Sequence, residues 1–166
     1  MAVDSGHPFP FLTNHTINAI VRIFQIQPDG TKDYKIAILP IPSVLDRIIE
    51  IPSRGNKEHR FVYLEDVITY YANQFFQGYG IEDYMVFRIT RDADLEIDEE
   101  EATDLLSEVE ASLRRRRRGD AVRLEVCGEV KDNLLDFVLT SVELEPKDVY
   151  RIDGHLAVSY THLTLP

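Results

Sequence analysis

Two arginines near the end of a predicted strand are the residues of this sequence best suited to contact phosphate. Arg88 and Arg91 stand in residues 87–95, directly before the predicted start of a helix. Guanidinium groups bind phosphate oxygens through charge-assisted hydrogen bonds, and helix N-termini attract anions. Their odd separation places them on opposite faces of an ideal strand, so one phosphate could reach both only if a turn at Asp92 re-aims Arg91. An ion pair with Asp92 or Asp94 is the alternative interpretation.

The rest of the sequence has no self-sufficient catalytic or metal-binding motif. An acidic run over residues 92–101 lacks the spacing and glycine of a calcium loop, and favours a solvated helix start. The sequence contains no phosphate-cradling glycine loop of the Walker type. The histidines show neither a metal-ligand spacing nor a recognisable triad; they are His7, His15, His59, His155 and His162. We therefore expect no catalytic residue and no metal ligand in this chain.

Five consecutive arginines, residues 114–118, raise the alternative of a nucleic-acid or polyanion patch. They end a predicted helix just before Gly119, where positive charge complements the helix dipole. Consecutive residues point around a helix, so the five side chains cannot all face one ligand. The formal net charge of −11 also argues against general nucleic-acid binding, which needs a basic surface. No nucleic-acid partner is expected.

Composition indicates one domain with a real core, because 166 residues with 44% hydrophobic content can bury enough apolar surface. The single cysteine, Cys127, excludes an internal disulfide and fits a reducing compartment as a buried structural thiol. No apolar run approaches the roughly 18 residues of a membrane span, and no signal peptide is visible. The sequence predicts a cytoplasmic protein.

The strand that carries both arginines covers about residues 84–91, where Met85, Phe87 and Ile89 alternate with more polar neighbours. Residues 17–26 and 34–39 form a predicted N-terminal β-hairpin around a Pro-Asp-Gly turn. Further strands are predicted at 45–51, 122–126 and 149–152, with a polar loop at 53–59. Helical spacing predicts helices at 64–76, about 98–118 and 134–142. The elements do not alternate strictly, so the predicted class is α+β: a mixed β-sheet with about three helices packed on it.

Five stretches, in this order along the chain, carry a resemblance to a known family. They are residues 9–14, 60–68, 87–94, 115–125 and 150–154, which read FPFLTN, RFVYLEDVI, FRITRDAD, RRRRGDAVRLE and YRIDG. Together they resemble the middle, or head, domain of polyphosphate kinase. Several motifs in the family's order are more specific than any one of them.

The resemblance implies an enzyme that transfers the terminal phosphate of ATP to inorganic polyphosphate, with Mg²⁺ and through a phosphohistidine. In this family the reactive histidine and most nucleotide contacts lie in C-terminal domains, so no histidine here inherits that role. The resemblance implies a non-catalytic head that supports dimerisation and borders the polyphosphate path. Arg88, Arg91 and, at the exit of the domain, Arg151 are the expected polyphosphate contacts. We expect a homo-oligomer, no ATP or Mg²⁺ bound to this part, and peripheral membrane association only through the parent enzyme.

The expected organisation is a head domain over residues 1–158 and a non-native tail over 159–166. The tail resembles translated vector sequence more than this family, so we expect the chain to be a piece of a longer enzyme. The alternative is a stand-alone α+β protein-interaction module without phosphate binding.

Overall fold

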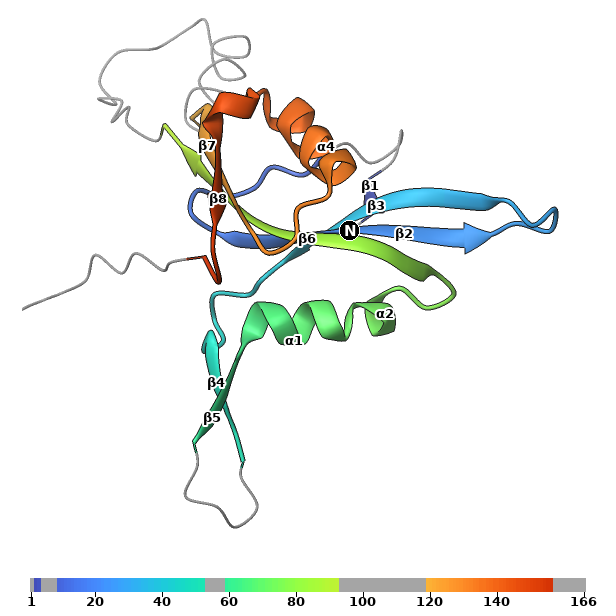
Figure 1. Cartoon of the computed structure of the whole chain (residues 1–166), viewed down its shortest axis with the longest axis horizontal. Helices are drawn as coiled ribbons and strands as arrows, with labels where there is room; N and C mark the ends of the chain where they lie inside the picture. Colours follow the sequence, from blue (N-terminus) through green and yellow to red (C-terminus); the bar gives the residue numbers. More distant parts are fainter. Residues whose placement is uncertain (1, 4–8, 53–58, 93–118, 157–166) are drawn as a thin grey trace, which may run out of the picture.

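The computed structural model of the chain describes residues 2–3, 9–52, 59–92 and 119–156. Its central element is a six-stranded sheet in the order β1-β3-β2-β6-β7-β8 (Figure 1). Neighbouring strands pair antiparallel except β7 and β8, which run parallel, so the sheet is mixed and the predicted α+β class is confirmed. The strands are β1 (Ala2–Val3), β2 (Ile17–Ile26), β3 (Lys32–Pro40), β6 (Gly80–Arg91), β7 (Ala121–Cys127) and β8 (Val149–Ile152).

The predicted N-terminal hairpin is confirmed as β2 and β3, which pair over nine residues from Asn18↔Pro40 to Ile26↔Lys32. Its turn is fixed by Asp29, whose Oδ1 accepts hydrogen bonds from the backbone N and the hydroxyl of Thr31 at 2.9 and 2.6 Å. Gly30 has a φ of 83°, a left-handed conformation that glycine adopts without a steric penalty. Local turn chemistry therefore sets the register of this pair.

β6 is the central strand, and the side chains on its two faces pack into two different hydrophobic clusters. Met85, Phe87 and Ile89 are at most 1% exposed and belong to the larger core. Val86 points the other way and packs into a smaller cluster with Ala19. This alternation is the period-2 pattern that the sequence predicts, and it places Arg88 on the side of Val86.

Helix α4 (Asp132–Val142) covers the larger core, as predicted for residues 134–142. It connects β7 to β8 and is followed by a short 3₁₀ helix, Pro146–Asp148. Two parallel neighbours need such a crossover, because a tight turn can only reverse the chain. Its buried residues are Leu134, Leu135, Val138 and Leu139.

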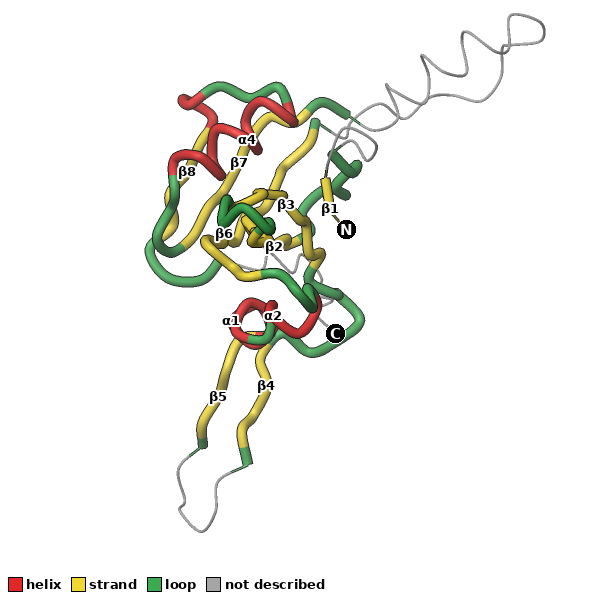
Figure 2. The backbone as a smooth tube through the Cα atoms, turned by 90° about the vertical axis from the view of Figure 1, so that its right-hand side faces the viewer, coloured by secondary structure: helices red, strands yellow, loops and turns green. Residues whose placement is uncertain are grey.

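Helix α1 (Leu64–Tyr70) packs on the opposite face, where Leu64 and Ile68 join the smaller cluster. The prediction of one continuous helix over residues 64–76 was wrong in one respect. The helix is interrupted at Tyr71, whose φ and ψ are −93° and 12°, and continues as the short α2 (Ala72–Phe75). The sheet therefore lies between α4 on one face and α1 with α2 on the other (Figures 1 and 2).

Strands β4 (Ile48–Ile51) and β5 (Arg60–Tyr63) form a separate antiparallel pair that projects from the body (Figure 2). We call this pair the β4–β5 arm. The predicted strand at 45–51 starts only at Ile48, and β5 was not predicted as a strand. Pairing with β4 explains β5, since a four-residue segment with a terminal arginine has no clear pattern of its own.

Three predictions fall on residues that the structure does not describe. The long helix at about 98–118 and the tail at 159–166 lie outside the described residues, as does most of the polar loop at 53–59. In the part of the chain that is described, no helix has the length and apolar content that crossing a membrane requires.

Candidate functional site

Arg88 lies directly opposite Glu125 in the pairing of β6 with β7. Its Nε and Nη2 donate to Oε2 of Glu125 at 2.7 and 2.6 Å, and the two residues are only 8% and 7% exposed. A carboxylate at this depth needs such compensation, because leaving it unpaired away from water is costly. The sequence suggested Asp92 or Asp94 as the ion-pair partner and did not identify Glu125. Asp94 lies outside the described residues.

The same carboxylate holds a second arginine. Arg123, two residues before Glu125 on the same face of β7, donates from Nη2 to Oε1 of Glu125 at 3.0 Å. Its guanidinium carbon lies 3.9 Å from the ring centroid of Tyr150 on β8. Sequence reasoning missed this role of Arg123. Strand alternation over 122–126 does place it beside Glu125, but it cannot give the register that brings Arg88 opposite.

Arg91 lies on the other face of β6, as the odd spacing from Arg88 predicts. Its Nε donates to the carbonyl oxygen of Leu12 at 2.9 Å and its Nη1 to that of Gly119 at 3.0 Å. The guanidinium also lies over the ring of Phe11, with its carbon 4.4 Å from the centroid. These contacts fix Arg91 between the N-terminal segment and the start of β7.

Arg151 is exposed on β8, where it is the register partner of Val126. Val126 belongs to the larger core, and β7 and β8 are parallel, so Arg151 shares the α4 side with Arg91. The structure therefore does not gather the three predicted arginines around one point. Arg88 stands on one face of the sheet, and Arg91 and Arg151 stand on the other.

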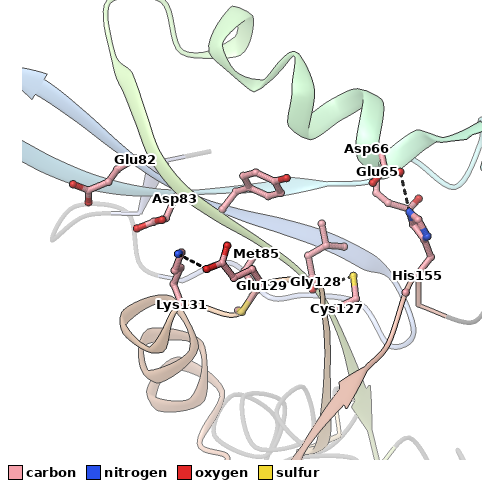
Figure 3. Close-up of a pocket in the computed structure, with 13 residues that line it drawn as sticks. Glu65, Asp66, Glu82, Asp83, Met85, Cys127, Gly128, Glu129, Lys131 and His155 are labelled. Atoms are coloured by element: carbon pink, nitrogen blue, oxygen red, sulfur yellow. Dashed lines mark hydrogen bonds and ion pairs between the residues drawn. The ribbon is translucent and has the colours of Figure 1, made fainter.

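A cavity of about 440 Å³ opens between α1, the start of β6 and the segment after β7 (Figure 3). Carboxylates dominate its lining: Glu65, Asp66, Glu82, Asp83 and Glu129 face two groups that can carry positive charge, Lys131 and His155. Lys131 is already paired with Glu129 at 2.9 Å, and His155 with Asp66 at 2.8 Å. Glu65 and Glu82 are paired as well, with Arg47 and Arg22. Each cation that lines the cavity is therefore already engaged by a carboxylate, and this arrangement does not favour a phosphate chain.

Cys127 lines the cavity as the single thiol of the chain, and it is partly buried. Burial raises its pKa, with the nearby Glu65 carboxylate adding to the effect. The Sγ atom lies 3.8 Å from the carbonyl oxygen of Val86, a weak hydrogen bond of the protonated thiol. A thiol held in its neutral form is a poor nucleophile, which agrees with the structural role predicted for it.

His155 combines a ring stack with a carboxylate partner and is less exposed than His59, which does the same. Its ring stacks on that of Tyr63, with centroids 3.7 Å apart, and its Nε2 faces Asp66 (Figure 3). Tyr63 ends β5 and Asp66 stands in the first turn of α1, so these contacts fasten the segment after β8 to the root of the arm. The geometry indicates a structural attachment.

The fold and this site define a mixed-sheet α+β domain with a buried arginine–glutamate pair between its central strands. A family model described as "Polyphosphate kinase middle domain" matches residues 1–162 of the chain. The chain belongs to this family, as its five sequence motifs predicted.

Curated relatives agree with the family model. Over 177 aligned residues, the chain is 41% identical to a polyphosphate kinase of Halalkalibacterium halodurans. The alignment covers 99% of this chain and 25% of that protein. It is 38% identical over 180 residues to one of Bacillus cereus, covering 100% and 26%. The crystal structure of polyphosphate kinase from Porphyromonas gingivalis shares the fold, with a TM-score of 0.69 and 22% identity over 94% of this chain and 21% of that one. The chain therefore spans about a quarter of the length of the relatives it matches.

Proposed function

We propose that this chain is the supporting domain of an enzyme that transfers the terminal phosphate of ATP to inorganic polyphosphate. The observation that carries the proposal is the family match over residues 1–162, together with relatives that are named polyphosphate kinase. Those relatives are about four times as long as the matched region, and in this proposal the catalytic histidine and the nucleotide site belong to polypeptide outside this chain. The domain acts in the cytoplasm as part of that enzyme.

In this proposal the domain borders the path of the polyphosphate chain, and Arg88, Arg91 and Arg151 contact its phosphates. Arg151 is exposed, and Arg91 has a fixed orientation because two main-chain carbonyls hold it. Arg88 is nearly buried, so a direct contact requires that a phosphate replace Glu125 as its partner. Arginine suits this role because its planar fork donates two parallel hydrogen bonds to a phosphate.

ATP and Mg²⁺ are used by the whole enzyme under this proposal. In the described part of the chain, no three histidine, cysteine, aspartate or glutamate side chains gather as metal ligands. The Mg²⁺ site of the enzyme is therefore proposed to lie outside the described residues.

The domain also supports assembly into a homo-oligomer, and the β4–β5 arm is the surface proposed for this contact. A two-stranded sheet is only marginally stable in water by itself. Ile48, Ile51 and Phe61 on the arm are nevertheless 57%, 45% and 60% exposed. Apolar groups gathered on a projecting element are typical of a protein–protein contact, and a second copy of the chain is the partner proposed here.

These same exposed residues favour the second candidate function, a protein-interaction module without phosphate binding. Light scattering and polyphosphate binding on the purified chain separate the two. A dimer that binds no polyphosphate favours the interaction module, whereas retention of polyphosphate favours the polyphosphate path.

The direct test replaces Arg91 and Arg151 together by alanine in the full-length enzyme that contains this chain. Arg151 is exposed, whereas Arg91 holds the main chain at Leu12 and Gly119, so circular dichroism must first establish that the double variant is folded. We expect weaker affinity for polyphosphate and unchanged affinity for ATP. Unchanged polyphosphate affinity in the folded double variant would reject the contact role. Arg88 needs a gentler replacement, Arg88→Lys, because alanine would leave Glu125 without this partner.

A further inference from the structure

One carboxylate serves two guanidinium groups on the face of the sheet away from α4. Oε2 of Glu125 accepts from Arg88, and Oε1 accepts from Arg123 at 3.0 Å. Both oxygens of the carboxylate are therefore engaged. Two positive charges share one negative charge, which leaves this trio with an excess of one positive charge.

The three members of the trio differ strongly in accessibility. The side chains of Arg88 and Glu125 are each 9% exposed, whereas that of Arg123 is 41% exposed. Arg88 lies beneath the surface and compensates the buried carboxylate. Arg123 is the guanidinium of the trio that a ligand from solution can reach.

Arg123 is also held in one orientation before any ligand arrives. The Glu125 carboxylate binds one edge of its guanidinium, and the ring of Tyr150 lies 3.9 Å from its central carbon. An aromatic ring in this position attracts the cation and limits its motion. A side chain fixed in this way loses less conformational freedom when it binds, so each hydrogen bond to a ligand contributes more affinity.

Among the described residues, the hydrogen-bond donors of Arg123 are only partly engaged. Its Nε atom is buried and has no hydrogen-bond partner among the described residues. An unmade bond of this kind is unfavourable, because the N–H has lost water without gaining an acceptor. This N–H lies too deep for a ligand in solution, so a phosphate would bind the terminal Nη groups of Arg123 instead.

We propose that Arg123 binds a phosphate oxyanion and that Glu125 and Tyr150 are positioning residues for it. The inference rests on the proposed function, in which this domain borders a polyphosphate path, and it adds a contact that the sequence did not suggest. A phosphate with two oxygens in one plane matches the fork of an arginine. The ligand is a phosphate group, carried either by an inorganic polyphosphate chain or by a nucleotide.

This contact adds a phosphate position on the Arg88 face, so a chain that also contacts Arg91 and Arg151 must pass around the β8 edge of the sheet. Arg123 stands on the same face as Arg88, on the side opposite Arg91 and Arg151. The carboxylate-lined cavity lies on another part of the Arg123 side. A phosphate chain on this face would approach Arg123 over the β7–β8 end of the sheet.

The test measures binding of fluorescently labelled long-chain polyphosphate to the 166-residue chain by anisotropy. The variants are Arg123→Ala, Arg123→Lys and Tyr150→Leu. Lys147→Ala is the matched control, because it removes one positive charge from an exposed lysine that pairs with Glu145 at 2.8 Å. Circular dichroism establishes that each variant is folded. ATP titrated in place of polyphosphate distinguishes the two sources of phosphate.

We expect Arg123→Ala to weaken polyphosphate binding roughly ten- to a hundred-fold, the range of one charge-assisted contact. It should also lower the slope of log affinity against log salt by about one, as the loss of one phosphate contact does. Arg123→Lys should recover only part of the affinity. Tyr150→Leu should weaken binding yet keep the salt slope, because the charge remains. Binding of ATP with the same dependence on Arg123 would assign the site to a nucleotide phosphate.

Two outcomes separate failure of this inference from failure of the proposed function. If the wild-type chain binds polyphosphate and folded Arg123→Ala binds it equally well, the inference is overturned and the proposed function stands. If the wild-type chain binds neither polyphosphate nor ATP, the bordering role itself is rejected, and the inference is rejected with it.

Discussion

Arg47 donates hydrogen bonds from Nε and Nη2 to Glu65, a carboxylate that is 1% exposed inside the protein. Arg47 precedes β4 and Glu65 stands in the first turn of α1. The main-chain carbonyl of Arg47 also accepts from the backbone N of Leu64 at 2.8 Å. The pair therefore fastens the root of the β4–β5 arm to the helix that follows it.

Removal of one member of this pair should destabilise the chain strongly. Arg47→Ala leaves the buried Glu65 carboxylate without its cation, which typically costs about 3–5 kcal/mol. Urea unfolding followed by circular dichroism measures the free energy of unfolding. Lys147→Ala breaks an exposed pair and should change it very little. Equal effects of the two substitutions would show that burial does not determine the contribution of the Arg47–Glu65 pair.

The end of α4 offers a stabilising substitution. Glu143 has a left-handed backbone, with φ 58° and ψ 40°, and its N–H bonds the carbonyl of Leu139. Glycine adopts this conformation without the steric penalty that a Cβ brings. Glu143→Gly removes a steric penalty of about 1–2 kcal/mol, and the extra backbone entropy that glycine loses on folding offsets about 0.5–1 kcal/mol of it. The free energy of unfolding should therefore rise by about 0.5–1 kcal/mol. Glu143→Ala removes the same negative charge from the helix C-terminus but keeps the Cβ, so it should bring a smaller gain. Equal gains with alanine and glycine would trace the effect to the lost charge.

Alkylation of Cys127 should depend on pH in a specific direction. Burial raises the pKa of this thiol, so the reactive thiolate forms only at higher pH than in an unfolded chain. Iodoacetamide should therefore react more slowly with the native chain than with the urea-unfolded chain between about pH 8 and 9. Because burial favours the neutral thiol in the folded chain, its contribution to the free energy of unfolding is present below the ordinary pKa of a thiol. This contribution is lost as the pH rises through the raised pKa of Cys127. Identical alkylation rates for the native and the unfolded chain would contradict a raised pKa of the Cys127 thiol.

The purified chain should lack transfer of phosphate from ATP to polyphosphate. The chain spans about a quarter of the length of the relatives it matches, and the proposed function places the reactive histidine outside it. A radiolabelled ATP assay, with a full-length relative as the positive control, measures the activity. Turnover above background by the 166-residue chain would place the reactive group inside these residues.

Substitution on the arm should affect assembly without affecting the fold. Phe61 is 60% exposed, so Phe61→Asp should leave circular dichroism unchanged. If the arm contacts a second copy, the charge introduced there should convert a dimer to a monomer in light scattering. Ile26→Asp, at a position that is 66% exposed on the far end of β2, is the control. A dimer that survives Phe61→Asp would move the contact away from the arm.

Much of the fold follows from local sequence signals. The alternation of Met85, Phe87 and Ile89 predicts the central strand and both of its faces, because strand side chains have a period of two. The Pro-Asp-Gly turn predicts the hairpin. The break at Tyr71 is not predictable in this way, since the apolar spacing of a helix continues across it.

The site was less accessible to sequence reasoning than the fold. The spacing of Arg88 and Arg91 correctly predicts opposite faces. It does not identify Glu125 as the partner of Arg88, because that pairing depends on a register between strands separated by residues 92–120. Strand β5 was missed for a similar reason. Its four residues have no strand pattern of their own, and they form a strand only because they pair with β4.

The position of β6 between β2 and β7 has a consequence for how the chain folds. The β2–β3 hairpin closes over a five-residue turn, whereas β6 joins β2 across more than fifty residues of intervening chain. Closing such long loops costs entropy before any contact compensates it. Folding should therefore be limited by docking of β6 onto an early hairpin, and its rate should be that of a topology rich in nonlocal contacts.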